Sequence, residues 1–97
     1  MRIKLLSSAS KDLEGGYQFY EKQSRGLGDY FLDSVFSDID SLLIHAGVHE
    51  KHFGFYRLLS SKFPFAIYYD IQGGSVLVYA ILDCRRKPTW TRQRFEN

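Results

Sequence analysis

The chain has few of the residues that cross-link or interrupt a small fold. Its 97 residues include one cysteine, Cys84, and two prolines. A single cysteine excludes an internal disulfide, so the hydrophobic core alone must hold the fold together. No apolar run reaches the roughly 18 residues that a membrane span needs. Met1–Ser10 has two basic residues and no long apolar stretch, so we expect no secretory signal and a cytoplasmic location.

Acidic residues are scarce in the second half of the chain. Residues 51–97 contain eight basic and three acidic residues, whereas residues 1–50 contain five basic and eight acidic ones. Five cations and no acid lie between positions 85 and 94: Arg85, Arg86, Lys87, Arg92 and Arg94. Such a basic end is typical of a protein that binds an acidic or polyanionic partner, with a solvated charge run as the alternative. Trp90 lies within this segment and can stack on a base or anchor a protein partner.

Aromatic side chains are frequent. Eight Phe, seven Tyr and one Trp make up 16% of the residues. Large rings bury much area per residue, which a short chain needs to offset its conformational entropy. We therefore interpret most of them as core, with a contact surface as the alternative. The length predicts one domain over residues 1–97, with a basic C-terminal tail at 84–97.

The spacing of apolar residues predicts two helices after a short first strand. Arg2–Leu6 alternates as a strand does. A helix of about 16 residues follows, with Ser7-Ser8 as its N-cap and apolar residues at helical spacing. Gly26-Leu27-Gly28 interrupts the pattern. We expect the second helix to open at Asp29 and to end before Gly47.

The second helix carries the clearest apolar stripe. Its members recur at steps of three and four residues: Phe31, Leu32, Val35, Phe36, Ile39, Leu42, Leu43 and Ala46. We expect the stripe to pack on the sheet, so that Phe36→Ala costs about 3–5 kcal/mol, the range for emptying a buried ring site. In the first helix, Gly15-Gly16 either lets another segment approach closely or is simply tolerated.

The second half predicts an antiparallel meander of three strands, at 56–59, 65–71 and 75–82. Val48–Lys51 is expected to be a connection, and Gln72-Gly73-Gly74 a hairpin turn. The last strand is apolar on both phases, which indicates a central strand covered on both faces. Residues 88–95 are either a polar tail or one short helix. The order β-α-α-β-β-β predicts a two-layer α+β domain, with a helical hairpin on a largely antiparallel four-stranded sheet.

Four segments of the sequence, together with this order of elements, are similar to segments of a known protein family. They are Lys11-Asp12-Leu13, Gly26-Leu27-Gly28 with Phe31, Phe63-Pro64-Phe65-Ala66-Ile67-Tyr68-Tyr69, and Ala80-Ile81-Leu82-Asp83-Cys84-Arg85-Arg86-Lys87-Pro88 with Trp90 and Arg92. Together they resemble the RelE/ParE family of toxins from bacterial type II toxin–antitoxin modules, a group of plasmid-stabilisation-type proteins. The resemblance covers nearly the whole chain. It implies a small toxin without cofactor or metal that forms an oligomer with an antitoxin, which wraps and neutralises it.

The resemblance leaves two cellular targets open. RelE-like members cut mRNA in the ribosomal A site, and ParE-like members poison DNA gyrase. For RelE-type cleavage, cations would stabilise the attacked phosphate, and the candidate catalytic residues here are Arg57, Arg85 and Arg86. The predicted surface for the antitoxin, gyrase or nucleic acid comprises Arg85, Arg86, Lys87, Trp90, Arg92 and Arg94.

The chain departs from the RelE-like residue set at three positions. Leu59 and Ala66 stand where that set has cations, and Trp90 lies nearest its C-terminal tyrosine. An indole N–H donates a hydrogen bond but is no practical acid. The long helical stretch from Ser8 to Ala46 also resembles the ParE-type hairpin. We therefore favour a ParE-like gyrase inhibitor, with a ribosome-dependent mRNA endonuclease or an inactive, degenerate member as alternatives.

Two further patterns have alternative interpretations. His45, His49 and His52 are spaced for a metal only if a helix runs through Gly47, and are otherwise ordinary loop histidines. Cys84 precedes two arginines, so it is either a thiol of lowered pKa or an unreactive cysteine. We favour the second interpretation in both cases.

Overall fold

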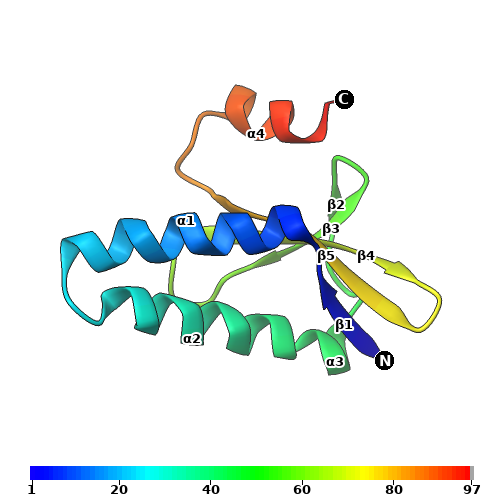
Figure 1. Ribbon diagram of the computed structural model, residues 1–97. Helices are drawn as coiled ribbons and strands as arrows, with labels where there is room; N and C mark the ends of the chain where they lie inside the picture. Colours follow the sequence, from blue (N-terminus) through cyan, green and yellow to red (C-terminus); the bar gives the residue numbers. More distant parts are fainter. Residues whose placement is uncertain (97) are drawn as a thin grey trace.

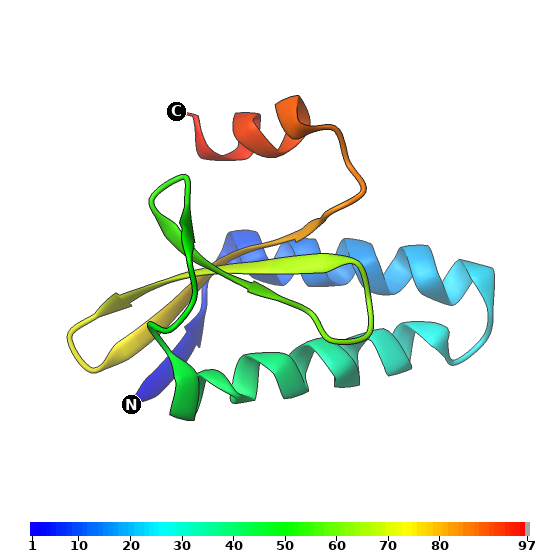
Figure 2. The same cartoon turned by 180° about the vertical axis from the view of Figure 1, so that it is seen from behind.

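The computed structural model describes residues 1–96, and within them a five-stranded sheet carries helices on both faces (Figures 1 and 2). The strands are β1 (Arg2–Leu5), β2 (Lys51–His52), β3 (Phe55–Leu59), β4 (Phe65–Gln72) and β5 (Ser75–Asp83). The helices are α1 (Ser7–Gln23), α2 (Leu27–Asp40), α3 (Leu42–His45) and α4 (Pro88–Phe95). In the described part of the chain, no helix is long and apolar enough to cross a membrane.

The strand order β1-β5-β4-β3-β2 places β5 inside the sheet. β1 runs parallel to β5, and the other neighbours are antiparallel. Val76 and Val78 of β5 belong to the core under the helical hairpin, whereas Ala80 and Leu82 belong to a second cluster on the opposite face. The prediction of a central strand covered on both faces is therefore confirmed. The predicted turn is also present, because Gly73 and Gly74 alone separate β4 from β5.

The predicted helical hairpin is present, and it packs on one face of the sheet (Figure 1). α1 begins at Ser7 without a side-chain cap, so the predicted Ser7-Ser8 cap is wrong. The Ser8 hydroxyl instead donates to the carbonyl oxygen of Tyr79 in β5, at 2.5 Å. This bond ties the start of α1 to the sheet.

The predicted start of α2 at Asp29 is also wrong, because the helix begins two residues earlier. The Glu21 carboxylate, from the last turn of α1, accepts hydrogen bonds from the backbone N–H groups of Gly26 and Gly28. A carboxylate at this position satisfies unpaired donors at the helix N-terminus and interacts favourably with the helix dipole. Gly26 has φ +87°, a conformation that a residue with a side chain rarely adopts.

Two glycines allow α1 and α2 to approach each other closely. A Cβ atom on Gly28 would lie 2.8 Å from the carbonyl oxygen of Tyr17, and one on Gly16 would lie 2.5 Å from the ring of Phe31. Gly15 has no heavy atom within 4 Å of such a Cβ. Of the predicted pair, Gly16 is therefore the close-approach position and Gly15 is tolerated.

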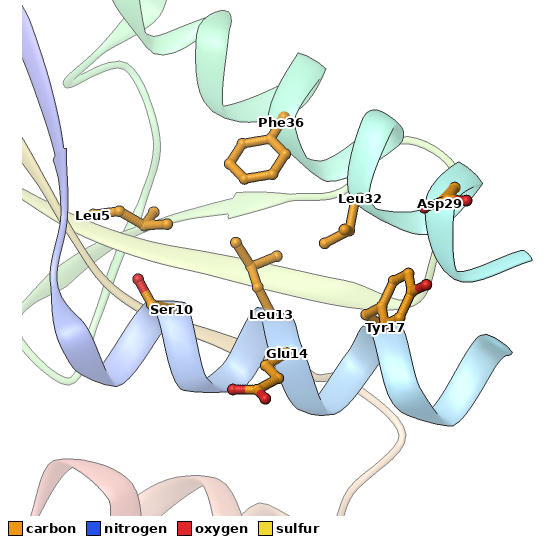
Figure 3. Close-up of a pocket in the computed structure, with 8 residues that line it drawn as sticks. All are labelled: Leu5, Ser10, Leu13, Glu14, Tyr17, Asp29, Leu32 and Phe36. Carbon is orange, nitrogen blue, oxygen red and sulfur yellow. The ribbon is translucent and has the colours of Figure 1, made fainter. Parts of the chain in front are cut away.

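The apolar stripe of the second helix is only partly buried. Phe31, Val35 and Ile39 belong to the main core, but Phe36 is 43% exposed. The prediction that Phe36 packs on the sheet is therefore wrong. The stripe is wider than the face that the sheet covers, and Phe36 lies at its edge, facing the neighbouring helix α1 (Figure 3). A turn at Ser41 divides the predicted helix into α2 and α3, which ends before Gly47.

α4 covers part of the second face of the sheet, apart from the hairpin (Figure 2). Its Trp90 and Phe95 pack against the cluster of Ala66, Tyr68, Ala80 and Leu82. The α+β class and the hairpin on a sheet are confirmed. Of the two alternatives for residues 88–95, the short helix is the one observed.

A short strand, β2, extends the sheet beyond the four predicted strands. Lys51 and His52 pair with Tyr56 and Phe55 of β3, so the prediction of Lys51 as part of a connection is wrong. Two residues are too few to show the alternation that identifies a strand. The turn between β2 and β3 consists of Phe53, with φ +57°, and Gly54, with φ +84°.

Candidate functional site

The basic C-terminal end contains two arginines that bind acids of the same chain. The first, Arg85, donates from Nε and Nη2 to the two carboxylate oxygens of Asp83, at 3.0 and 2.8 Å. This hydrogen bonding lowers the pKa of Asp83. Arg85 also contacts the Tyr20 hydroxyl and the Phe19 ring, which places it against the side of α1.

The second paired arginine is Arg94, which forms a two-pronged salt bridge with Asp12 of α1. Nη1 and Nη2 donate to the two carboxylate oxygens at 2.8 and 2.9 Å. Oδ2 of Asp12 also accepts from the backbone N–H of Ile81 in β5, at 3.0 Å. One carboxylate thus joins α1, β5 and α4, which gives Arg94 a role in fixing α4.

Arg86 is held by an aromatic ring rather than by an acid. Its guanidinium carbon lies 4.5 Å from the centre of the Trp90 ring. Stacking of this kind restricts the guanidinium but leaves its N–H edge available to a planar anion. Lys87, just before α4, and Arg92, within it, are exposed.

The arginine cleft lies between the β2–β3 hairpin, the end of β5 and α4. Its volume is about 250 Å³, and its lining residues are His52, Phe53, Arg57, Tyr68, Leu82, Asp83, Cys84, Arg86, Pro88, Thr91 and Arg92. It brings Arg57, from the middle of the chain, together with Arg86 and Arg92. The sequence showed these three cations but not that they share a cleft. Nothing in the spacing of its residues indicated that His52 and Phe53 line the cleft as well.

Two nucleophile-bearing side chains line the arginine cleft, and both have raised pKa values. Burial raises the pKa of the Tyr68 hydroxyl, and the Arg57 guanidinium opposes that rise. Burial also raises the pKa of the Cys84 thiol, again opposed by Arg57. Both groups are therefore protonated near neutral pH, where they donate hydrogen bonds rather than act as nucleophiles. This agrees with an unreactive Cys84.

The three positions at which the chain departs from the RelE-like pattern are not among the lining residues of the arginine cleft. Leu59 is 55% exposed on β3, and Ala66 of β4 is its partner in the register of the two strands. Ala66 is 1% exposed and belongs to the cluster beneath α4. Trp90 packs against the same cluster. None of these three side chains carries a charge.

The hairpin groove is a second concave surface, between α1 and α2 on the side away from the C-terminal helix (Figure 3). Its volume is about 490 Å³, and its lining residues are Leu5, Ser10, Leu13, Glu14, Tyr17, Asp29, Leu32 and Phe36. Phe36 and Leu32 on α2 face Leu13 on α1 across it, as Figure 3 shows.

Two acidic side chains line the hairpin groove. Glu14 and Asp29 line it together with the apolar side chains, and Asp29 is the main cause of a raised pKa at the Tyr17 hydroxyl. The groove therefore suits an apolar segment that also carries cations. The sequence did not indicate this surface, because Phe36 belongs to the same apolar stripe as the residues of α2 that enter the core.

The histidines do not form a metal site. Among residues 1–96, no three His, Cys, Asp or Glu side chains are placed to hold a metal ion. His49 instead lies with its Nδ1 2.5 Å from the hydroxyl of the fully buried Tyr69. That oxygen also accepts from the backbone N–H of Gly47, so the pair fixes the loop after α3.

The fold is similar to that of a chain in a solved structure, "Chromosomal ParDE TA system from P. aeruginosa", with a TM-score of 0.69. The match covers 84% of this chain and 92% of that chain, at 19% sequence identity. No protein-family model matches the chain, and neither does any curated protein. The chain therefore has the fold of a ParDE toxin–antitoxin component, as its resemblance to the RelE/ParE toxins predicts.

Proposed function

We propose that this chain is the toxin of a type II toxin–antitoxin pair and that it acts by binding DNA gyrase. The observation that carries the proposal is the fold shared over 84% of the chain with a component of a ParDE system. A toxin of this kind acts on a bacterial target inside the cell, which agrees with the predicted cytoplasmic location.

The hairpin groove is the proposed binding site for the antitoxin. A segment of the antitoxin would bury apolar side chains against Leu13, Leu32 and Phe36 and place cations near Glu14 and Asp29. Such a segment would fold on binding, as disordered regions that wrap a partner do. Acidic residues elsewhere in the antitoxin would face the exposed cations Arg86, Lys87 and Arg92.

Gyrase is favoured over mRNA as the target because of the groups around the arginine cleft. Attack of a ribose 2′-OH on phosphate requires a proton acceptor, a proton donor and cations for the developing charge. Arginine stays protonated and is a poor base. With leucine at 59 and alanine at 66, the sheet lacks two of the expected charges. Binding a protein requires only a complementary surface, which Trp90 and its neighbouring cations can supply.

One observation favours a second candidate, the mRNA endonuclease. Arg57 and Arg86, two of the three candidate catalytic residues, line the same cleft as the Tyr68 hydroxyl. The third, Arg85, lies against Asp83 and α1. An endonuclease would therefore have to work with Arg57, Arg86 and Tyr68.

Controlled expression in a bacterial host separates these functions. DNA synthesis is measured by thymidine incorporation, and mRNA 5′ ends are mapped in the same culture. We expect DNA synthesis to stop before mRNA levels change. New 5′ ends within ribosomal A-site codons, with DNA synthesis continuing, would establish the endonuclease. Harmless expression together with tight antitoxin binding would identify the degenerate member.

A further inference from the structure

The α1–α4 cleft is a further concave surface, lined by α1, the end of β5 and the segment from Arg86 to Trp90. We propose that it binds an acidic segment of the target protein that carries an apolar side chain. The proposal rests on the proposed function, because it takes gyrase as that target. The cleft has a volume of about 530 Å³. It is separate from the hairpin groove, because α2 and α4 lie on opposite sides of α1 (Figures 1 and 2).

The base of the α1–α4 cleft is apolar, and aromatic rings flank it. Phe65 and Ile81, both buried in the main core, form the base. Phe19 of α1 is 49% exposed and lines the cleft together with Trp90 of α4. Apolar and aromatic side chains around a concave surface receive the anchor residues of protein partners. The cleft therefore suits an apolar side chain of a partner protein.

Gly15 keeps the middle of this cleft open. It lies exposed in the interior of α1 and lines the cleft, and no heavy atom lies within 4 Å of the position that a Cβ would take. Glycine weakens a helix interior, and no close contact within the described chain requires it at this position. The missing side chain gives a partner access to the backbone of α1.

The charge of the cleft is positive, because its carboxylates are neutralised within the fold. Asp12 and Asp83 each accept hydrogen bonds through both oxygens from an arginine outside the lining. The cations that line the cleft are Lys11 and Arg86, and neither takes part in the salt bridges found in residues 1–96. Positive charge that is not compensated within a surface favours carboxylates in the bound partner.

The positions of the two cations indicate the form of the bound segment. Lys11 lies one turn before Gly15 on the same face of α1. Arg86 lies in the loop that leads to α4, and its guanidinium carbon is 4.5 Å from the centre of the Trp90 ring. An arginine held in this way can bind a carboxylate through two N–H donors. An apolar residue flanked by Asp or Glu therefore fits the cleft, with its side chain over Gly15.

The composition of the cleft favours a protein segment over a nucleic acid. A nucleic-acid backbone would bring closely spaced phosphates toward Asp12 and Asp83, whereas an apolar side chain between two acids can avoid them. The antitoxin is assigned to the hairpin groove on the other side of α1. The target can therefore occupy the α1–α4 cleft until acidic residues of the antitoxin cover Arg86.

Two substitutions at Gly15 test the cleft without weakening the fold. Gly15→Leu places an apolar side chain where that of the partner would lie, and Gly15→Ala is the matched control that leaves most of the space open. Leucine and alanine are both better helix formers than glycine, so urea denaturation should show no loss of stability in either variant. For Gly15→Leu, we expect the concentration that half-inhibits supercoiling by purified gyrase to rise about tenfold, as for loss of an anchor contact. For Gly15→Ala, it should not change.

A second pair of variants tests the charge of the cleft. Lys11→Gln removes a cation of the lining, and Lys22→Gln removes one that is exposed on α1 but does not line the cleft. Lys11→Gln should weaken the affinity for gyrase about threefold, the size expected of one exposed ion pair. Lys22→Gln should leave the affinity unchanged. Calorimetric titration of each variant with gyrase measures the two values.

The parent chain separates failure of this proposal from failure of the proposed function. If the parent inhibits gyrase and Gly15→Leu inhibits it equally well, the α1–α4 cleft is not the binding surface, and the toxin function stands. Equal weakening by Lys11→Gln and Lys22→Gln would also overturn the proposal, because it would show a general effect of charge. If the parent neither binds nor inhibits gyrase, the proposed function fails, and this proposal fails with it.

Discussion

At the scale of single residues, the adjacent glycines of α1 occupy opposite environments. Gly15 is exposed with free space around it, whereas a Cβ on Gly16 would overlap the ring of Phe31. Glycine in a helix interior costs about 1 kcal/mol relative to alanine, so Gly15→Ala should stabilise the fold by about that amount. Gly16→Ala should destabilise it by about 1–3 kcal/mol, because the ring is fully buried and cannot easily move. Urea denaturation of the two variants measures both effects, and equal midpoints would contradict the close approach of α1 and α2.

Two phenylalanines of α2 likewise differ in burial, although the sequence placed both on one stripe. Phe31 is fully buried among aromatic rings, and Phe36 is 43% exposed in the hairpin groove. Phe31→Ala should cost about 3–5 kcal/mol. Phe36→Ala should cost about 1 kcal/mol or less while weakening antitoxin binding. The denaturant midpoint and the antitoxin affinity of each variant separate the two roles, and a larger midpoint shift for Phe36→Ala would show that the groove is core.

At the scale of elements, the loop after α3 depends on the contact between His49 and Tyr69. The backbone N–H of Gly47 donates to the Tyr69 oxygen, so the hydroxyl hydrogen is free to bond a neutral Nδ1 of His49. Burial, followed by the charge of His45, lowers the pKa of His49 below its usual value of 6.5. The unfolded chain therefore binds more protons than the folded chain as the pH falls below about 6.5.

The free energy of unfolding should accordingly decrease as the pH falls through the lowered pKa of His49. It should be at its full value above about pH 6.5. In His49→Gln, which retains a hydrogen-bonding side chain without titrating, this dependence should be weaker. Chemical denaturation at pH 7.5, 6.5 and 5.5 measures it. Identical pH profiles for the parent chain and the variant would rule out this role for His49.

The most accurate predictions were of elements that are recognisable from the local spacing of apolar residues. Apolar spacing identified the two helices and the strands that became β1, β3, β4 and β5. It missed β2, which has only two residues, and misplaced the start of α2, which depends on the Glu21 carboxylate bonding Gly26 and Gly28. Apolar spacing does not show which side chain of the preceding helix will supply a cap.

The candidate site was predictable only in part, for a similar reason. The basic residues were visible in the sequence, but their partners were not. Arg94 binds Asp12, which lies 82 positions earlier. Arg57 of β3 and Arg86, in the loop between β5 and α4, line one cleft only because the tertiary fold brings these two segments together. Contacts between residues far apart in sequence depend on the tertiary fold. Charge density alone therefore did not separate the arginines that form salt bridges within the fold from those that can bind a partner.

At the scale of the whole molecule, two surfaces of opposite charge lie on different sides of one small fold. The hairpin groove is apolar with acidic groups, and the arginine cleft is basic. In the proposed toxin, the antitoxin would occupy the groove and also cover the exposed cations at the basic end, which would keep the target from them. Substitutions in the hairpin groove should then weaken neutralisation by the antitoxin without weakening the inhibition of gyrase.

Supercoiling of relaxed plasmid by purified gyrase, in the presence of the purified chain, tests the central claim most directly. The chain is expected to block supercoiling in proportion to its concentration, and prior mixing with its antitoxin should restore it. Phe36→Ala should still block supercoiling but be neutralised less well. Full supercoiling at every concentration of a folded chain, together with cleavage of ribosome-bound mRNA by the same preparation, would contradict the account.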